Sequence, residues 1–566
     1  MDQPPCSCLK SIFRFIPDST FFDRYSSFII FSATLLLCLM NLHLRPEFIA
    51  IDSRFALFVH EMLENGEFFW PTLHGKPYPD YTGFPTFLSM TAARITGKVN
   101  YFSLVFPSAA AAALLNVLTW KIGERLFNKK IALTAVFLSF GSFTLVSIYR
   151  IASCDLYPAL VSAAGVYITV AAIEEQKEKH IYLTLPLLIF GYLGRGPIGA
   201  IVPAACICSV LLAERKYSLM ISFGRFAAYL TFLLLIIWCC GIYFKGGIDQ
   251  LNDCLYMQIT HRMSKGRPFW YYFADAAGSF AFMYPAALIT TVLYIRKFKT
   301  GLLEDKKLRP FLICAAWMLC VAIGFSIPGT KHLRYITPLM PAAALIAAHL
   351  FWNVHRIREI RFLRKLFFML ATPVSFLAIP GFLGTQLILS HPWVENKLHC
   401  SVELPVISGT IILLLLNLAV LFSRRARRFR RLVILGVMCL LVAFLRIMIV
   451  EPIEDSILNS RSFTAKCEAL RGDQPMGFFA LGPDGDENKY MVNVARHRQF
   501  VPFYVSKTDL RAETCKRTAK LPRGAMITAR LDRWKKLDKK ITRIWEPVAS
   551  GRIGRRDCIL LKKKTF

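Results

Sequence analysis

The sequence predicts a mainly α-helical, polytopic membrane protein with a small exported C-terminal domain of α/β or α+β class. Of its 566 residues, 55% are hydrophobic, and the mean hydropathy is +0.44. Long segments without Asp, Glu, Lys or Arg recur along the first 450 residues. Lys and Arg cluster on every second connection between these segments. Together these features are typical of a chain that crosses a membrane many times.

The uncharged segments predict about 13 transmembrane helices, because a helix needs about 20 apolar residues to cross the hydrocarbon core. The longer segments are residues 25–44, 99–120, 131–149, 156–173, 196–213, 226–244, 276–295, 310–330, 335–354, 366–390 and 404–423. Two shorter segments, residues 181–194 and 432–445, complete the set.

The distribution of Lys and Arg predicts how the chain is oriented. Basic clusters at residues 296–309 and 423–431 mark cytoplasmic connections. We therefore expect residues 1–24 to be a cytoplasmic tail, residues 25–450 to be transmembrane and residues 451–566 to be exported. The net charge of +32 fits contacts with anionic membrane lipids. Nucleic acid is not an expected partner of the exported part.

The first outer loop, residues 45–98, is too polar to span a membrane. Its segment RFALFVHEMLENGEFFW has apolar residues at helical spacing, which predicts an amphipathic helix on the membrane surface. Residues 84–97 predict a second helix. The segments that predict strands in the exported domain are residues 477–482, 499–505 and 525–531.

Three carboxylates lie on the predicted outer side and are candidates for chemistry. Asp52 follows the first span, Asp80 lies in a loop rich in Pro and Gly, and Asp155 lies between two spans. Each has a simple structural explanation: Asp52 or Asp155 would cap a helix, Asp155 would pair with Arg150, and Asp80 would form a turn. Their shared side favours a common site over three unrelated structural roles.

Basic residues gather on the same predicted side. LGRGPIG contains Arg195, HRMSKGRPFWYYF contains His261 and Arg262, and SIPGTKHLRYITPLMP contains Lys331, Arg334 and Tyr335. Lys and Arg bind phosphate oxygens well, although a basic residue at a membrane interface can also extend to the lipid headgroups. The sequence has no P-loop, GxGxxG, HExxH or GxSxG motif, which disfavours a nucleotide or hydride cofactor.

Several segments resemble the GT-C glycosyltransferases, in particular the bacterial aminoarabinose transferases of lipid A modification and their protein-mannosyltransferase relatives. The resemblance covers roughly residues 25–350. It rests on the segments IDSRFALFVHEMLENGEFFWPTLHGKPYPDYTGFPTFL, RIASCDLYPAL, YLGRGPIGAIVP and SIPGTKHLRYITPLMP. GT-C-like members also have about 13 spans and an exported C-terminal domain, which agrees with the spans expected from the ~20-residue apolar segments.

The resemblance implies an inverting transfer of a sugar from a polyprenyl-phosphate donor to an envelope acceptor, either lipid A in lipopolysaccharide or another glycan. It also implies a bacterial inner membrane, with the site and the C-terminal domain facing the periplasm. Asp52 and Asp155 match the acidic residues of the family's outer loops and would be catalytic. The residues that would bind the donor phosphate are Arg54, Arg195, Arg262, Lys331, Arg334 and Tyr335.

The chain departs from the family pattern in the first loop. The family shows two consecutive acidic residues before the loop Arg, whereas Ile51 precedes Asp52 here. Asp80 and His261 stand near the family's remaining polar positions and are candidate ligands of a divalent metal; no other cofactor is expected.

Two other functions stay open at this point: a transporter or flippase of lipid-linked saccharides, and a protein O-mannosyltransferase-like enzyme. A transporter more often has two related halves and charges near the middle of the membrane. Here no internal repeat is evident, and the polar groups lie on one predicted side, which favours the enzyme.

Overall fold

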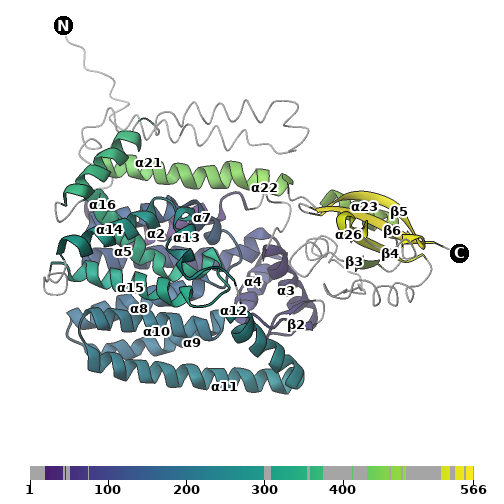
Figure 1. Ribbon diagram of the computed structural model, residues 1–566, viewed down its shortest axis with the longest axis horizontal. Coiled ribbons are helices and arrows are strands. Elements are labelled where there is room, and N and C mark those ends of the chain that lie inside the picture. The colour runs from purple at the N-terminus through teal and green to yellow at the C-terminus, as the bar shows by residue number, and fades with distance from the viewer. Residues whose placement is uncertain are drawn as a thin grey trace, which may run out of the picture. The chain divides into compact units, whose positions relative to one another are not determined.

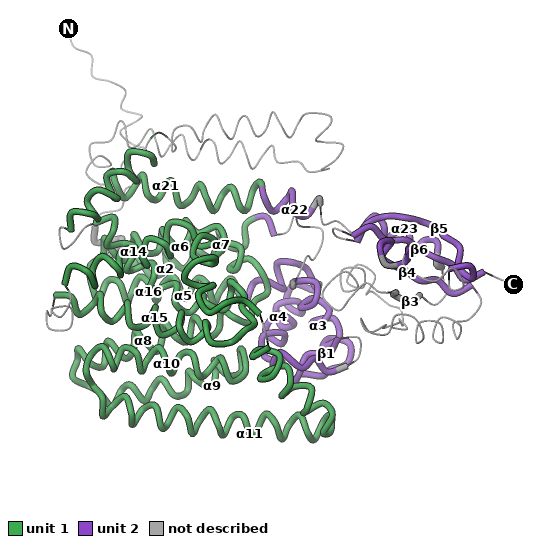
Figure 2. The backbone as a smooth tube through the Cα atoms, in the orientation of Figure 1, with its two compact units in different colours: residues 1–40, 108–391, 401–449 green, residues 41–107, 392–400, 450–566 purple. Residues whose placement is uncertain are grey.

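The computed structural model describes residues 19–42, 45, 51–73, 76–264, 266–298, 307–352, 357–371, 373, 411, 430–457, 461–472, 476–479, 524–535, 542–553 and 556–564. The chain forms two compact units (Figure 2). Unit 1 comprises residues 1–40, 108–391 and 401–449, and unit 2 comprises residues 41–107, 392–400 and 450–566.

Unit 1 is helical, as the hydropathy pattern predicts (Figure 1). Each uncharged segment expected to span between residues 25 and 354 coincides with a helix or a pair of helices. The helices are α2 (Ser19–Leu39), α5 (Tyr101–Leu126), α6 (Lys129–Phe140), α7 (Phe143–Tyr149), α8 (Leu156–Glu174), η3 (Glu178–Thr184), α9 (Leu185–Arg195), α10 (Pro197–Ala213), α11 (Tyr217–Leu255), η4 (Tyr256–Thr260), α12 (His261–Met263), η5 (Phe269–Tyr272), α13 (Asp275–Ser279), α14 (Met283–Phe298), α15 (Arg309–Ser326), η7 (Leu333–Leu339), α16 (Met340–Trp352) and α21 (Arg430–Leu445).

Within the described residues, six helices are long and apolar enough to cross a membrane. The number rises to seven if α6 and α7, which meet at a bend of 80°, form one span. The expected spans at residues 366–390 and 404–423 lie almost entirely outside the described residues. The mainly helical class is therefore confirmed, and the total of about 13 spans stays a prediction.

One hydrophobic cluster of unit 1 lies among α8, α9, α10 and α11. Val161, Leu188, Ile207 and Phe223 come from these four helices and are all nearly inaccessible to solvent. α11 runs beside α9 and α10 (Figure 1) and leaves most of its apolar side chains exposed. An apolar helix with one packed face and one uncovered apolar face is suited to contact lipid.

Unit 2 contains the first outer loop and the C-terminal region. The amphipathic helix expected in the loop is α3 (Ile51–Asn65), and the second expected helix is α4 (Phe84–Thr96). A short hairpin of β1 (Thr72–Leu73) and β2 (Lys76–Pro77) lies between them in the chain. Further helices in the described part of the chain are α22 (Glu451–Ile457), which directly follows η8 (Arg446–Val450), α23 (Arg461–Arg471) and α26 (Leu531–Trp534).

The C-terminal region has a four-stranded sheet in the order β3-β4-β6-β5. β3 and β4 are parallel, and the other pairs are antiparallel. The strands are β3 (Met476–Phe479), β4 (Met526–Arg530), β5 (Trp545–Ile553) and β6 (Arg556–Lys563). β3 and β4 match two of the expected strands, whereas residues 499–505 lie outside the described residues. The pattern did not predict β5 and β6, since charged residues interrupt their alternation.

Two residues, Arg45 and Leu57, anchor the first outer loop within unit 2. Arg45 forms an ion pair of 2.9 Å with Asp455 of α22, and its guanidinium lies 4.1 Å from the centre of the Tyr101 ring. Leu57 of α3 belongs to the same hydrophobic cluster as Phe463 of α23. The loop is thus attached to the C-terminal region through both charge and apolar packing.

One buried arginine closes the end of α2 in unit 1. Arg150 has no exposed surface, and its guanidinium donates hydrogen bonds to the carbonyl oxygens of Leu37, Cys38 and Met40 at 2.7–2.9 Å. These carbonyls lie at the C-terminal end of the helix, where they have no partner within the helix. A cation at this end also interacts favourably with the helix dipole.

Replacing Arg150 by Met should therefore destabilise the protein. Three carbonyls would lose a charged donor, and hydrogen bonds to charged groups contribute about 1.5–3 kcal/mol each, so a loss of at least about 3 kcal/mol is expected. The midpoint of thermal unfolding in detergent measures the effect. Arg296→Met, at an exposed position of α14, is the matched control, and equal midpoints for the two variants would contradict the capping role.

Candidate functional site

The first part of the site is the loop that leads into α8. Asp155 occupies the N-cap position of this helix but makes no capping hydrogen bond with its side chain. Its backbone N–H donates to Ser153 Oγ at 3.2 Å, and the Ser153 N–H donates to Ser108 Oγ at 3.0 Å. The two serines hold the loop in place, so the Asp155 carboxylate is left to bind groups from other segments.

The second part is the tight turn from α9 to α10, which carries Arg195. Gly196 has a φ of +66°, a conformation that glycine adopts at little cost. A side chain on Gly199 would collide with the carbonyl oxygen of Gly191, and one on Gly194 would come within 2.6 Å of Tyr157 Cβ. These glycines let the two helices approach each other and α8, which brings Arg195 to Asp155.

The third part comes from two segments that are distant in sequence. Arg262 lies in α12, and Arg334 and Tyr335 lie in η7. Arg262 Nη1 is 3.5 Å from the Tyr335 hydroxyl, and its guanidinium lies 5.9 Å from the centre of the Tyr335 ring. The Arg334 guanidinium lies 5.6 Å from the same ring. Tyr335 thus separates and orients two cations.

Asp155 is the centre of this arrangement. Its Oδ1 accepts a hydrogen bond from Arg195 Nε at 3.0 Å, and its Oδ2 is 2.8 Å from Arg334 Nε. Burial raises the pKa of the Asp155 carboxyl, but the guanidiniums of Arg195, Arg334 and Arg262 lower it by more, so the pKa lies below its usual value. The carboxylate therefore stays ionised at neutral pH and is a weak base.

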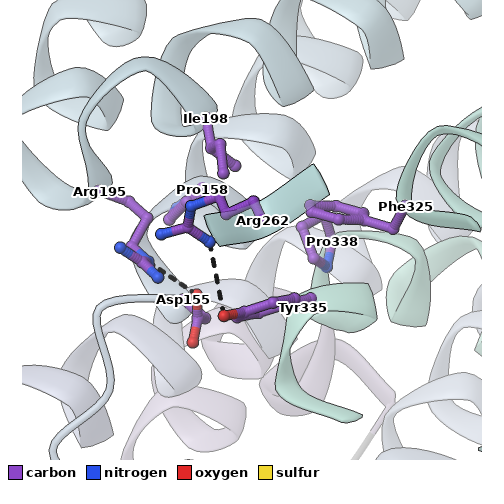
Figure 3. Close-up of a pocket in the computed structure, with 8 residues that line it drawn as sticks. All are labelled: Asp155, Pro158, Arg195, Ile198, Arg262, Phe325, Tyr335 and Pro338. Atoms are coloured by element: carbon purple, nitrogen blue, oxygen red, sulfur yellow. Dashed lines mark hydrogen bonds and ion pairs between the residues drawn. The ribbon is translucent and has the colours of Figure 1, made fainter. Parts of the chain in front are cut away.

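These residues line a pocket with two kinds of wall (Figure 3). Asp155, Arg195, Arg262 and Tyr335 provide the polar wall. Two guanidiniums, those of Arg195 and Arg262, face one carboxylate in this wall, and Arg334 pairs with the same carboxylate from outside the lining. The wall therefore carries excess positive charge and suits an anion. The apolar wall consists of Pro158, Ile198, Phe325 and Pro338.

The structure brings together most of the candidate residues that lie in unit 1. Lys331 is buried, with 4% of its surface exposed, and its ammonium donates to the carbonyl oxygens of Arg267, at 3.0 Å, and Pro328. It does not line the pocket. His261 is exposed on α12, and its carbonyl oxygen accepts a hydrogen bond from Thr330.

The candidate residues of the first outer loop lie in unit 2. Asp52 is the second residue of α3 and has only 1% of its surface exposed. Arg54 Nη1 donates to the Tyr78 hydroxyl at 2.7 Å, and its guanidinium lies 5.2 Å from the centre of that ring. Asp80 is half-buried after β2. The roles predicted for Asp52, Arg54 and Asp80 stay predictions.

The candidate metal ligands also stay a prediction. Within the described ranges, no group of three or more His, Cys, Asp or Glu side chains is placed to hold a metal ion. Asp80 lies in unit 2 and His261 in unit 1. The arginine-rich donor set of the pocket is unsuited to a cation, since metal ions take carboxylate, imidazole or thiolate ligands.

Some site residues were missed by the sequence reasoning. Ser153 stands two positions before Asp155 in SCD, a spacing at which a serine hydroxyl often binds a nearby backbone N–H. That pattern could have indicated its role. Pro158, Ile198 and Phe325 carry no comparable signal, because an apolar residue in a transmembrane segment looks the same whether it faces lipid, core or pocket.

Comparison with known proteins identifies related sequences. Residues 84–241 match the family described as dolichyl-phosphate-mannose-protein mannosyltransferase. The chain is 24% identical over 384 residues to the undecaprenyl phosphate-alpha-4-amino-4-deoxy-L-arabinose arabinosyl transferase of Pectobacterium carotovorum, covering 64% of each chain. It is 25% identical over 331 residues to the enzyme of the same name from Aeromonas hydrophila, covering 55% of this chain and 57% of that one. The chain thus spans less than two thirds of the length of these curated relatives.

Solved structures decide the fold. ArnT from Cupriavidus metallidurans in the apo state superposes with a TM-score of 0.66 at 12% identity, covering 94% of this chain and 97% of that one. The chain has the ArnT fold. ArnT bound to undecaprenyl phosphate superposes with a TM-score of 0.65 at 14% identity, covering 95% and 98% of the two chains. The ArnT fold and the six candidate spans make the chain a multi-pass membrane protein, and its predicted resemblance to the GT-C glycosyltransferases is confirmed.

The charge balance of the pocket predicts the behaviour of Asp155→Asn. Losing the carboxylate leaves the guanidiniums without their counter-charge, and breaking a buried ion pair on one side costs about 3–5 kcal/mol. We expect a lower midpoint of thermal unfolding that added polyprenyl phosphate partly restores, because its anionic head replaces the carboxylate. Asp249→Asn, at an exposed position on α11, should show neither effect. If Asp155→Asn lowers the midpoint and added polyprenyl phosphate does not raise it again, the result would contradict an anion site in this pocket.

The lowered pKa of Asp155 also fixes a pH dependence. In the folded state, the Asp155 carboxyl stays ionised down to a pH below its usual pKa of 3.8. The ion pairs therefore stabilise the protein at every pH above 3.8. This stabilisation is lost only as the pH falls through the lower pKa of the folded state. The difference in unfolding free energy between wild type and Asp155→Asn should therefore be constant from about pH 5 to about pH 8. A difference that shrinks within this range would show that the pKa is not lowered.

Proposed function

We propose that the chain is an inverting glycosyltransferase that moves a sugar from a polyprenyl-phosphate donor to an envelope acceptor. The observation that carries the proposal is the two-sided pocket around Asp155. A group that fits it has an anionic head for Arg195 and Arg262 and a hydrocarbon part for the apolar wall. A lipid phosphate has both, whereas a nucleotide would leave the apolar wall uncovered.

The charge change during the reaction matches this pocket. Attack by the acceptor oxygen on the anomeric carbon forms the new glycosidic bond and breaks the bond from that carbon to the phosphate oxygen. The electron pair of the broken bond stays on the phosphate, so a singly charged diester becomes a more highly charged monoester. Cations that bind the phosphate more tightly as its charge grows lower the barrier.

We assign Asp155 a positioning role within this reaction. Arg195 and Arg334 occupy both of its oxygens, and its low pKa makes it a poor acceptor for the proton of an attacking hydroxyl. Asp52, the other predicted catalytic carboxylate, then remains the candidate general base if the acceptor is a hydroxyl. If the acceptor is a lipid phosphate, its oxygen is already a nucleophile, and no base is required.

The names of the relatives support a proposal for the acceptor and the setting. Several curated relatives are named as arabinosyl transferases that use an undecaprenyl-phosphate-linked sugar, which favours lipid A in lipopolysaccharide or another envelope glycan. The family match at residues 84–241 carries the name of a protein mannosyltransferase, which makes a protein hydroxyl the second candidate. The bacterial origin of these relatives favours a bacterial inner membrane, with the pocket facing the periplasm, as the setting.

Release of polyprenyl phosphate from a labelled lipid-linked sugar tests the proposal. The purified protein should release polyprenyl phosphate when the correct acceptor is supplied, and comparing lipid A, another envelope glycan and a protein acceptor identifies the substrate.

Arg195→Gln and Arg334→Gln should each lower kcat about 100-fold, the usual effect of removing a group that stabilises developing negative charge. Arg296→Gln is the control. Asp52→Asn should abolish transfer to a hydroxyl, and unchanged release in this variant would exclude Asp52 as the base.

A further inference from the structure

Hydrogen bonds to backbone groups join two loops of unit 1 that are distant in sequence. We define the two-loop clamp as residues 261–264 and 266–267 together with residues 328–331. The Arg267 N–H donates to the Gly329 oxygen at 3.0 Å, and the Thr330 N–H donates to the Arg262 oxygen at 3.1 Å. Thr330 Oγ1 donates to the His261 oxygen at 3.0 Å. The two loops are thus paired by a short ladder outside any strand.

Glycine permits this pairing on both sides. A side chain on Gly266 would collide with the carbonyl oxygen of Gly329, and a side chain on Gly329 would collide with the carbonyl oxygen of Ser264. Neither glycine has a positive φ, so both are required for space and not for backbone conformation. The clamp therefore depends on close contact between two backbones.

Lys331 joins the two halves of the clamp. Its ammonium donates to the carbonyl oxygen of Arg267 on one loop, at 3.0 Å, and of Pro328 on the other. The side chain is 4% exposed and does not line the pocket. Two carbonyl partners compensate for much of the water that a buried ammonium loses.

We propose that Lys331 is a positioning residue that locks the two-loop clamp and does not bind the donor phosphate. The clamp begins beside Arg262 and ends three residues before Arg334, so it fixes the distance between two of the cations around Asp155. This inference rests on the proposed function for the identity of the phosphate. The sequence reasoning placed Lys331 among the phosphate ligands, and its buried position between two carbonyls assigns it a different task.

Arg262 needs such a lock because the segment just before it, η4 (Tyr256–Thr260), packs few side chains. It lies in α12, which directly follows the π-helical turn η4. η4 has no buried residue. A turn without buried side chains opens easily, whereas α15 and η7 on the other side of the clamp each contribute several buried side chains. The clamp transfers the rigidity of that side to Arg262.

Hydrogen–deuterium exchange of the ligand-free protein tests the lock without any assumption about activity. In Lys331→Met, the amides of Arg267 and Thr330 should exchange at least about tenfold faster than in the wild type, because a local opening that costs about 1.4 kcal/mol less is ten times more populated. Lys216→Met, which removes an exposed lysine paired with Glu178, is the matched control. Unchanged exchange at both amides would overturn the proposal, whether or not the protein transfers a sugar.

A double-mutant cycle separates positioning from direct binding. Gly329→Ala breaks the same clamp and removes no charge. Lys331→Met and Gly329→Ala should each weaken binding of polyprenyl phosphate about tenfold, and the double variant should bind no more weakly than either single variant, because both act through one contact. If Lys331 bound the phosphate itself, the losses in binding free energy of the two single variants would add in the double variant. Gly329→Ala alone would then keep the contribution of Lys331 to lipid binding. If wild-type protein does not bind the lipid, the proposed function fails, while the exchange result still decides the role of Lys331.

Discussion

The site depends on one buried carboxylate. Asp155 draws together guanidiniums from the turn between α9 and α10 and from η7, and it lies close enough to a third, on α12, to feel its charge. Without a negative charge at that point, cations so close together and so far from water would repel one another. The carboxylate compensates for only part of their charge. The remaining positive charge makes the pocket suited to an anion.

The surrounding fold keeps this arrangement in place with few interactions. Glycines at the turn between α9 and α10 remove side chains that would push Arg195 away, and Arg150 holds the end of α2 from the opposite end of the RIASCD segment. Ser153 and Ser108 fix the backbone just before Asp155 through two hydrogen bonds from backbone N–H groups. Each contact constrains the backbone near a charged group, so the charges are oriented before any ligand arrives, which reduces the cost of binding.

The chemistry explains why no nucleotide motif is needed. A sugar carried on a lipid phosphate already has a leaving group, so the protein has only to bind that group and stabilise its growing charge. Arginine suits this task, since it stays ionised in a buried site and offers donors in a fixed plane. In the proposed reaction, burial of the hydrocarbon part against Pro158, Ile198 and Phe325 would add selectivity for a lipid over a soluble phosphate.

The sequence by itself determined the helical class, the positions of most described helices, the two helices of the first outer loop and the residue types of the site. These follow from hydropathy and local spacing, which act over a few residues. Only the tertiary structure decided the partners. Arg150 was a sequence-local candidate to pair with Asp155, yet it caps α2, and the ion-pair partners of Asp155 come from residues 195 and 334. Likewise, the basic loop suggests a phosphate ligand at Lys331, and only the fold shows that its ammonium donates to the carbonyl oxygens of Arg267 and Pro328. A charge selects its partner by distance and burial in three dimensions, and a linear pattern contains neither.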